Sequence, residues 1–208
     1  MTAPAPREEQ APGRRERRKR ATRQALLDAG LELIGDRGVY LMRIEDVTER
    51  ADVAKGAFYN YFDSKASLVA ALVRDSVDAL DLDYLRVATP GPELAQRLSA
   101  VAVAHEGFFG AWPSRELLLH QARGLLEQGK ESGSAQLSEA FNAYLLVLGR
   151  FLFPARRSIG RAELDAAAAV AGTISGYRSF SRAAGQTPRA GALARLLHGG
   201  AAALSAKR

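Results

Sequence analysis

Apolar residues recur at helical spacing along most of the chain, and no stretch shows the two-residue alternation of a β-strand. Helix-breaking clusters interrupt the pattern at residues 89–92, 112–114 and 129–133. The predicted helices cover residues 22–37, 44–51, 53–62, 65–85, 93–110, 115–128, 135–153, 161–184 and 188–204. The sequence therefore predicts an all-α fold of about nine helices.

The stretch from Arg43 to Lys65 is predicted to contain two short helices joined by a tight turn. The apolar face of the first helix repeats at i, i+3, i+4 and i+7, and consists of Ile44, Val47, Thr48 and Ala51. Asp52 occupies the turn, where aspartate tolerates a left-handed backbone. Ser64 is expected to cap the long helix that follows.

The second short helix has two faces of different character. The residues expected to point inward are Val53, Phe58 and Phe62. The residues expected to point outward are Lys55, Gly56, Tyr59 and Asn60. A basic, aromatic and amide outer face is typical of the recognition helix of a helix-turn-helix, which enters the DNA major groove. An ordinary helical hairpin is the alternative.

Residues 22–72 resemble the DNA-binding domain of the TetR family of bacterial transcriptional regulators. The positions that match the family pattern are Asp46, Val47, Ala51, Val53, Gly56, Phe58, Tyr59, Tyr61, Phe62, Ser64 and Lys65. The rest of the chain agrees with the family in length, helical pattern and placement.

Four positions depart from the family pattern. Met42 replaces a usual threonine, Asp52 a glycine, Ala54 a serine and Ala57 a threonine. Ala54 has no side-chain oxygen to cap the recognition helix, a loss that typically costs about 0.5–2 kcal/mol. Ala57 lacks a hydroxyl that commonly reaches DNA in the family.

The resemblance implies a ligand-responsive repressor that binds a palindromic operator in double-stranded DNA as a homodimer. It implies phosphate contacts by Tyr59 and Lys65. Asn60 is the best candidate for reading a base edge, because an amide can pair bidentately with adenine. The candidate DNA-binding residues are Arg43, Lys55, Gly56, Ala57, Tyr59, Asn60, Tyr61 and Lys65.

The last two helices are expected to form the dimer interface. Small residues crowd the segment 166–176, and leucines form a stripe along residues 193–204. In the family, such helices pair with those of a second subunit in a four-helix bundle. An intramolecular hairpin is the alternative.

The middle helices carry aromatic and polar side chains that suggest a small-molecule site, since pockets often form between helices. Family membership implies an inducer pocket in this region. The candidate ligand-binding residues are His105, Phe108, Phe109, Trp112, His120, Phe141, Tyr144 and Tyr177. The alternative for each of these residues is a place in the hydrophobic core.

The net charge of +6 and the isoelectric point near 9.9 favour an anionic partner. Residues 1–20 are expected to be a disordered basic arm, because they are rich in proline, alanine and charge and have nothing to bury. The run RRERRKR at residues 14–20 directly precedes the DNA-binding domain, so it is placed to contact phosphates or the minor groove. A solvated face is the alternative.

The sequence contains no cysteine, which excludes disulfides, zinc–thiolate sites and thiol catalysis. The histidines lack metal-ligand spacing. We therefore predict no catalytic residue, no metal site and no cofactor.

The longest uncharged run of the late helices, between Asp165 and Arg178, is shorter than the roughly 20 residues of a membrane span. With no secretory signal at the start, we expect a cytoplasmic protein without membrane association.

These features predict a helix-turn-helix domain at residues 21–65 and a regulatory domain for ligand binding and dimerisation at residues 66–208. The long helix from Lys65 is expected to couple the two. Two other functions are considered: a non-specific nucleic-acid-binding protein that uses the basic arm, and a helical-bundle protein that binds a small molecule. The motif from Asp46 to Lys65 argues against both.

Overall fold

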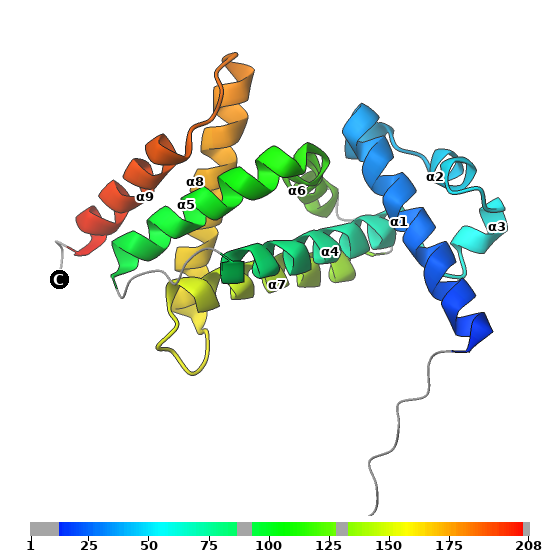
Figure 1. Cartoon of the computed structure of the whole chain (residues 1–208), viewed down its shortest axis with the longest axis horizontal. Coiled ribbons are helices and arrows are strands. Elements are labelled where there is room, and N and C mark those ends of the chain that lie inside the picture. Colours follow the sequence, from blue (N-terminus) through cyan, green and yellow to red (C-terminus); the bar gives the residue numbers. More distant parts are fainter. Residues whose placement is uncertain (1–12, 87–92, 128–132, 206–208) are drawn as a thin grey trace, which may run out of the picture.

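The computed structural model describes residues 13–86, 93–127 and 133–205, which form nine helices and no strand (Figure 1). The helices are α1 (Arg14–Leu41), α2 (Ile44–Arg50), α3 (Lys55–Phe58), α4 (Lys65–Arg86), α5 (Leu94–Ala111), α6 (Pro113–Glu127), α7 (Ser134–Leu152), α8 (Arg161–Ala183) and α9 (Ala190–Ser205). The all-α prediction is confirmed. The expected disorder of residues 1–12, the break at residues 89–92 and residues 129–132 of the last break lie outside the described residues.

The helices are arranged around a central pair formed by α4 and α7 (Figure 1). Helix α1 packs across α2, α4 and α6, while α5 packs against α9 and α8 packs against α7. The buried apolar side chains form one continuous cluster that runs from α1 to α9. The short helices α2 and α3 thus lie at one end of the molecule, and α8 and α9 lie at the other (Figure 1).

The apolar face predicted for residues 44–62 anchors the short helices to α1. Val47, Phe58 and Phe62 are buried, and the rings of the two phenylalanines lie 5.6 Å apart between centroids. Met42, which replaces the family's usual threonine, is also buried in this core. Hydrophobic packing therefore supplies the stability that helices this short lack on their own.

Helix α1 is bent at Gly38, where the sequence predicts a helix end. The backbone leaves helical geometry there with φ of 81°, a left-handed value that favours glycine. The chain then continues in one more turn to Leu41. The Lys65 ammonium donates hydrogen bonds to the carbonyl oxygens of Tyr40 and Met42, each at 3.2 Å, and so fastens this turn to the start of α4.

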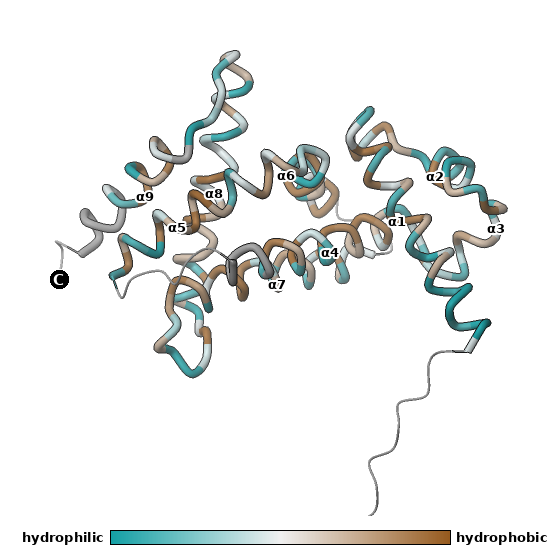
Figure 2. The backbone as a smooth tube through the Cα atoms, in the orientation of Figure 1, coloured by the Kyte–Doolittle hydropathy of each residue, from teal (hydrophilic) through white to brown (hydrophobic). Residues whose placement is uncertain are grey.

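The expected disorder of residues 14–20 is wrong, because this run forms the first turns of α1. The Arg17 N–H donates to the Gly13 carbonyl at 3.0 Å, and Glu16 pairs with Arg20 one turn later. Arginine, lysine and glutamate are good helix formers, so the run extends the helix that follows it. These turns are strongly hydrophilic, in contrast to the apolar stretches of α4 and α5 (Figure 2).

Among the described helices, none combines the length and the apolar character that a bilayer-crossing segment needs.

Candidate DNA interface and ligand cavity

The two short helices α2 and α3 are joined by a tight turn. Asp52 has φ of 52°, the left-handed conformation predicted for it. The Val53 N–H donates to the Thr48 carbonyl at 3.0 Å and closes the turn. At the start of α4, the Ser67 N–H donates to the Ser64 hydroxyl oxygen at 3.1 Å, which confirms Ser64 as a cap.

Helix α3 is shorter than the predicted segment 53–62. Regular helix covers Lys55–Phe58, and single turns continue to Phe62 through hydrogen bonds from Tyr61 and Phe62 to the Phe58 carbonyl. Ala54 precedes the helix without a side-chain cap, and Gly56 lowers its helix propensity. The segment is therefore held by Phe58 and Phe62 more than by its own hydrogen bonds.

The outer face of α3 is open. Lys55, Gly56, Tyr59 and Asn60 are exposed as predicted, and Tyr59 is 52% exposed. A Cβ atom added at Gly56 would meet no heavy atom within 4 Å, so another molecule can approach the backbone closely there. Ala57 and Tyr61 are half-buried at the edge of this face.

The cations around α3 are paired with carboxylates of α2. Lys55 Nζ lies 2.6 Å from Glu45 Oε1, and Arg43 Nη2 lies 2.9 Å from Asp46 Oδ1. Arg37 also reaches Asp46, at 3.0 Å. Hydrogen bonds from Lys55 and Arg43 hold the pKa of Glu45 and of Asp46 below their ordinary values. Exposed pairs of this kind are weak, so a phosphate can compete for the same cations.

Lys65, a predicted phosphate contact, is half-buried and bound to two backbone carbonyls. It therefore has a structural role at the junction of α1 and α4 in addition to the contact that the resemblance implies.

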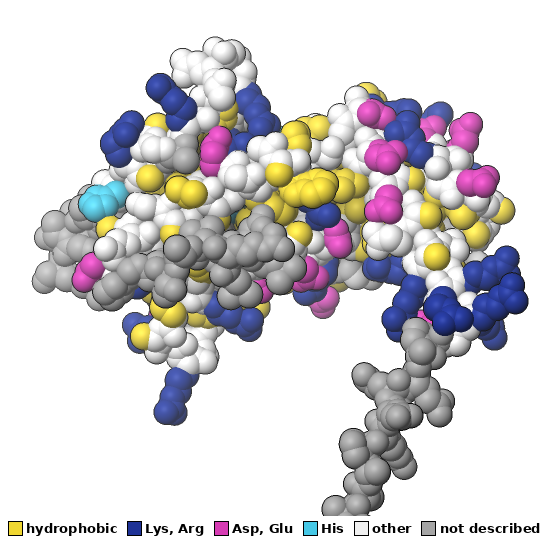
Figure 3. Space-filling view, viewed as in Figure 1, with side chains coloured by type: hydrophobic (Ala, Val, Ile, Leu, Met, Phe, Trp, Pro, Cys, Tyr) yellow, Lys and Arg dark blue, Asp and Glu magenta, His cyan; other side chains and the backbone are white. Residues whose placement is uncertain are grey.

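Residues 53–62 are called the recognition segment below. The basic start of α1 lies beside the end of this segment. A groove is lined by Arg15, Arg18, Lys19 and Thr22 on one side and by Asn60 and Tyr61 on the other, with Gly13 and Glu16 at its margin. Figure 3 shows Lys and Arg side chains gathered at this end of α1. The basic run and the outer face of α3 thus form one continuous surface.

A cavity of about 600 Å³ lies between α5, α6, α7 and α8. Four of the predicted ligand-binding residues line it: Phe109, His120, Phe141 and Tyr144. The side chains of the middle helices thus form a cavity of the size that small molecules usually occupy, about 300–1,000 Å³.

The other four predicted ligand residues do not line the cavity, because their side chains lie on other faces or at the ends of their helices. His105 is buried behind Tyr144 and Phe108 belongs to the core. Trp112 is 54% exposed where α5 ends. The Tyr177 hydroxyl bonds to the backbone of Arg189, before α9.

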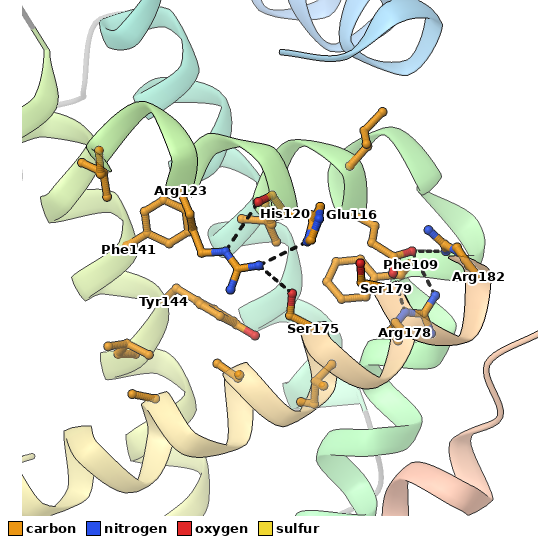
Figure 4. Close-up of a pocket in the computed structure, with 18 residues that line it drawn as sticks. Phe109, Glu116, His120, Arg123, Phe141, Tyr144, Ser175, Arg178, Ser179 and Arg182 are labelled. Carbon is orange, nitrogen blue, oxygen red and sulfur yellow. Dashed lines mark hydrogen bonds and ion pairs between the residues drawn. The ribbon is translucent and has the colours of Figure 1, made fainter. Parts of the chain in front are cut away.

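Polar and charged residues that line the cavity were missed from the sequence. They are Glu116, Arg123, Ser175, Arg178, Ser179 and Arg182 (Figure 4). The overlooked signal is the position of Arg178, which continues the buried stripe of Ala167 and Ile174 on α8. A charge on the buried stripe of a helix indicates a partner inside the fold.

That partner is a pair of glutamates. Arg178 Nε lies 2.7 Å from Glu116 Oε1, and Arg178 Nη1 lies 2.7 Å from Glu106 Oε2. Arg182 also bonds to Glu116. Burial by itself lowers the pKa of Arg178, but hydrogen bonds and charge attraction from Glu116 and Glu106 outweigh it and raise the pKa above the ordinary value. Arg178 also lies over the Phe109 ring, 5.3 Å from its centroid.

Arg123 lies at the opposite part of the cavity and is exposed. Its Nη2 donates to Ser175 Oγ at 3.0 Å and to His120 Nδ1 at 3.2 Å (Figure 4). Among the described residues, no carboxylate forms an ion pair with Arg123.

Tyr144 is held by the buried His105. His105 Nδ1 lies 2.9 Å from the Val101 carbonyl and therefore carries the hydrogen, so Nε2 accepts from the Tyr144 hydroxyl at 2.8 Å. Burial lowers the pKa of His105 to about 4, which keeps the ring neutral. Burial also raises the pKa of Tyr144 above its ordinary value.

Within the described part of the chain, no group of three His, Asp or Glu side chains could hold a metal ion.

The tight turn, the buried phenylalanines and the open basic face define a helix-turn-helix DNA-binding protein with a helical second domain. Residues 26–72 match the profile described as bacterial regulatory proteins of the tetR family. The uncharacterized regulator TtgW of Pseudomonas putida is 30% identical over 128 residues, which cover 60% of this chain and 91% of that protein. The chain belongs to the TetR family of bacterial transcriptional regulators.

Two further comparisons concern the sequence and the fold. The transcriptional repressor KstR of Mycolicibacterium smegmatis is 38% identical over 85 residues, or 41% of this chain, and the match spans only 39% of that repressor. The crystal structure of the regulator FadR from Bacillus subtilis, in complex with stearoyl-CoA, is similar with a TM-score of 0.59 and 19% identity. That similarity covers 84% of this chain and 95% of FadR and concerns the fold.

Proposed function

We propose that the protein is a transcriptional repressor that binds a palindromic DNA operator as a homodimer and releases it when a small molecule fills the cavity. The observation that carries the proposal is the continuous surface formed by the open face of α3 and the basic start of α1. A repressor of this kind acts by binding rather than by catalysis, and it works in the cytoplasm, where the chromosome is.

The roles proposed for the DNA-binding residues follow from their placement. Asn60 and Lys55, exposed on the recognition segment, face the base edges of the major groove. Tyr59 and the arginines of α1 contact phosphates, which fix the register of the protein on the duplex. Asp46 and Glu45 give up their paired cations to the DNA when it binds.

The proposed dimer uses α8 and α9. Phe180 on α8 is 79% exposed and Leu196 on α9 is 55% exposed, so each offers a large apolar side chain that a partner could cover. Small residues also leave a side of α8 away from the cavity open to close approach, since Ala169 is exposed and a Cβ atom added at Gly176 would meet no heavy atom within 4 Å. A second copy of the chain, packed as a four-helix bundle, would bury these groups.

The route proposed for the response to a ligand runs through α6 as well as α4. One face of α6 lines the cavity with Glu116, His120 and Arg123. On another face, the Gln121 amide oxygen accepts a 2.7 Å hydrogen bond from the Val39 N–H, just after the bend in α1. A ligand that displaces α6 would therefore move α1, and operator DNA must weaken ligand binding reciprocally.

The comparisons support both halves of the proposal. KstR, a relative that matches 85 residues of this chain, is named a repressor. FadR, which shares the fold, was crystallised in complex with stearoyl-CoA. We extend both features, repression and the binding of a small molecule, to this chain as parts of the proposal.

In-vitro selection of randomised duplexes by the full-length protein at near-physiological salt tests the proposed function. Sequencing of the bound pool is expected to reveal an inverted repeat. Binding without enrichment would instead favour a non-specific nucleic-acid-binding protein that uses the basic start of α1. Absence of binding would overturn the proposal and leave a helical-bundle small-molecule-binding protein.

A further inference from the structure

We propose that the cavity binds an amphipathic organic acid, with its acidic group paired to Arg123 and its apolar body between α6, α7 and α8. This inference rests on the proposed role of the cavity as an effector site. It goes further because it commits to the charge, the polarity and the orientation of the ligand.

The charges that line the cavity are balanced everywhere except at Arg123. Arg178 and Arg182 are held by Glu116, and Glu106 provides a second carboxylate for Arg178. No carboxylate among the described residues pairs with Arg123. A ligand with one negative charge would complete the balance.

Arg123 is already oriented to receive an anion. Its Nη2 is bound to Ser175 Oγ and His120 Nδ1, and its Nε lies 3.5 Å from the His120 carbonyl. No described residue bonds to Nη1, so both of its N–H groups are left for a ligand. A guanidinium fixed in this way loses little side-chain freedom when a carboxylate binds.

The remainder of the lining is suited to an apolar body. Its apolar side chains are Leu117, Leu119, Leu126, Phe141, Leu145 and Ile174. These side chains come from α6, α7 and α8, so a hydrocarbon among them would be enclosed from three sides. Because Arg123 is exposed, the acidic group would lie at the mouth, where part of its hydration is kept.

Tyr144 helps to fix this orientation. Its hydroxyl hydrogen is donated to His105, so the oxygen can offer only lone pairs to the cavity. An acidic group would find no hydrogen-bond donor in this hydroxyl and would pair with Arg123 instead. A cationic ligand is disfavoured for a separate reason, since Glu116 already serves two arginines.

The test is direct binding by calorimetry, without DNA, to matched pairs of probes below their micellar concentrations. The probes are dodecanoate, dodecanol and dodecylamine, together with 1-naphthoate and 1-naphthylmethanol. We expect at least one acid to bind about tenfold or more tightly than its alcohol. Arg123→Gln should lower the affinity for the acid far more than the affinity for its alcohol, and so remove this gap.

Two control variants sharpen the result. Arg150→Gln makes the same change at an exposed position of α7 that does not line the cavity, so it should retain the full preference for the acid. Arg123→Lys, which keeps the charge and loses the planar fork, should retain part of it.

Equal binding of acids and alcohols, tighter binding of dodecylamine, no binding of any probe, or an unchanged preference in Arg123→Gln would each overturn the proposal. The selection of operator DNA uses no ligand. Its outcome is therefore independent of this test, and a repressor with a different effector would fail here and still enrich an inverted repeat.

Discussion

Asn60 is exposed at the end of the recognition segment, next to the basic turns of α1. We predict that Asn60→Ala lowers the preference at one base pair of each half-site by about 1–3 kcal/mol, because the amide no longer reads a base edge. Tyr59→Ala should instead weaken binding to all sequences alike. Affinities for the selected operator and its single-base variants, measured by fluorescence anisotropy, distinguish the two.

Asn142→Ala, an exposed change on α7, serves as the matched control and should bind like the wild type. If Asn60→Ala kept the full preference at every base pair, Asn60 would not be a specificity residue.

The buried His105 predicts a pH dependence of stability. Its pKa is about 4 in the folded protein against an ordinary value of 6.5, so between these values the unfolded chain binds a proton that the folded chain does not. The free energy of unfolding should therefore fall as the pH is lowered from 6.5 towards 4. The full effect is about 3 kcal/mol.

Urea unfolding of the wild type and of His105→Gln at pH 7 and pH 4.5 measures this effect. The wild type is expected to lose about 2–3 kcal/mol more than the variant over this interval. Carboxylates that titrate in the same interval affect both proteins and cancel in the comparison. Equal losses would mean that His105 is not the group responsible.

The sequence predicted the structural roles of some single residues correctly and of others not. Asp52, Phe58 and Ser64 have roles set by local geometry, so turn, packing and capping rules predicted them correctly. Phe108 and Trp112 have roles set by the rotation of α5 against its neighbours. Aromatic character alone therefore did not separate a core residue from a cavity residue.

At the scale of elements, the start of α1 is a helix rather than a disordered arm, and this changes what its charges can do. Replacing Arg15, Arg18 and Lys19 by glutamine keeps good helix formers in place and removes three cations beside Asn60. The slope of log affinity against log salt should become shallower by about 0.9 for each lost phosphate contact. Operator titrations at several salt concentrations measure the slope.

An unchanged slope in that triple variant would show that the basic turns face solvent in the complex. Circular dichroism of the variant checks that the helix remains formed.

One side-chain amide of α6 bonds to the backbone of α1. Gln121→Ala would leave the buried residue Val39 without the acceptor of its backbone N–H, so we expect a loss of about 1–3 kcal/mol in the free energy of unfolding. Gln136→Ala, exposed in the first turn of α7, is the control and should change stability little. Urea unfolding that cannot distinguish the two variants would argue against the junction as a structural link.

Among the elements, α3 and α8 were the least predictable. The apolar spacing of residues 53–62 is compatible with a longer helix, but Gly56 and the uncapped Ala54 leave a single turn. On α8, the small residues suggested an interface, whereas Arg178 on the same helix marks the cavity. Which face of α8 meets which partner depends on packing between helices far apart in the sequence.

At the scale of the whole molecule, the sequence predicted the all-α class and the order of the helices, because hydrophobic periodicity is a local property. It could not predict the cavity as a set of charges. Glu106 and Glu116 meet Arg178 and Arg182 only after α5, α6 and α8 have packed together. Charged residues that the sequence pattern did not single out are thus the residues that give the cavity its chemistry.

The proposed repressor reads its operator with two recognition segments that act together from one homodimer. The most direct test of this is the affinity for the selected operator compared with the same duplex carrying five extra base pairs between the half-sites. Five base pairs are about half a helical turn, since one turn is about 10–10.5 base pairs, so the insertion rotates one half-site to the opposite face. We predict that affinity falls to that of a single half-site. Undiminished binding to the lengthened duplex would contradict the proposed dimeric reading of DNA.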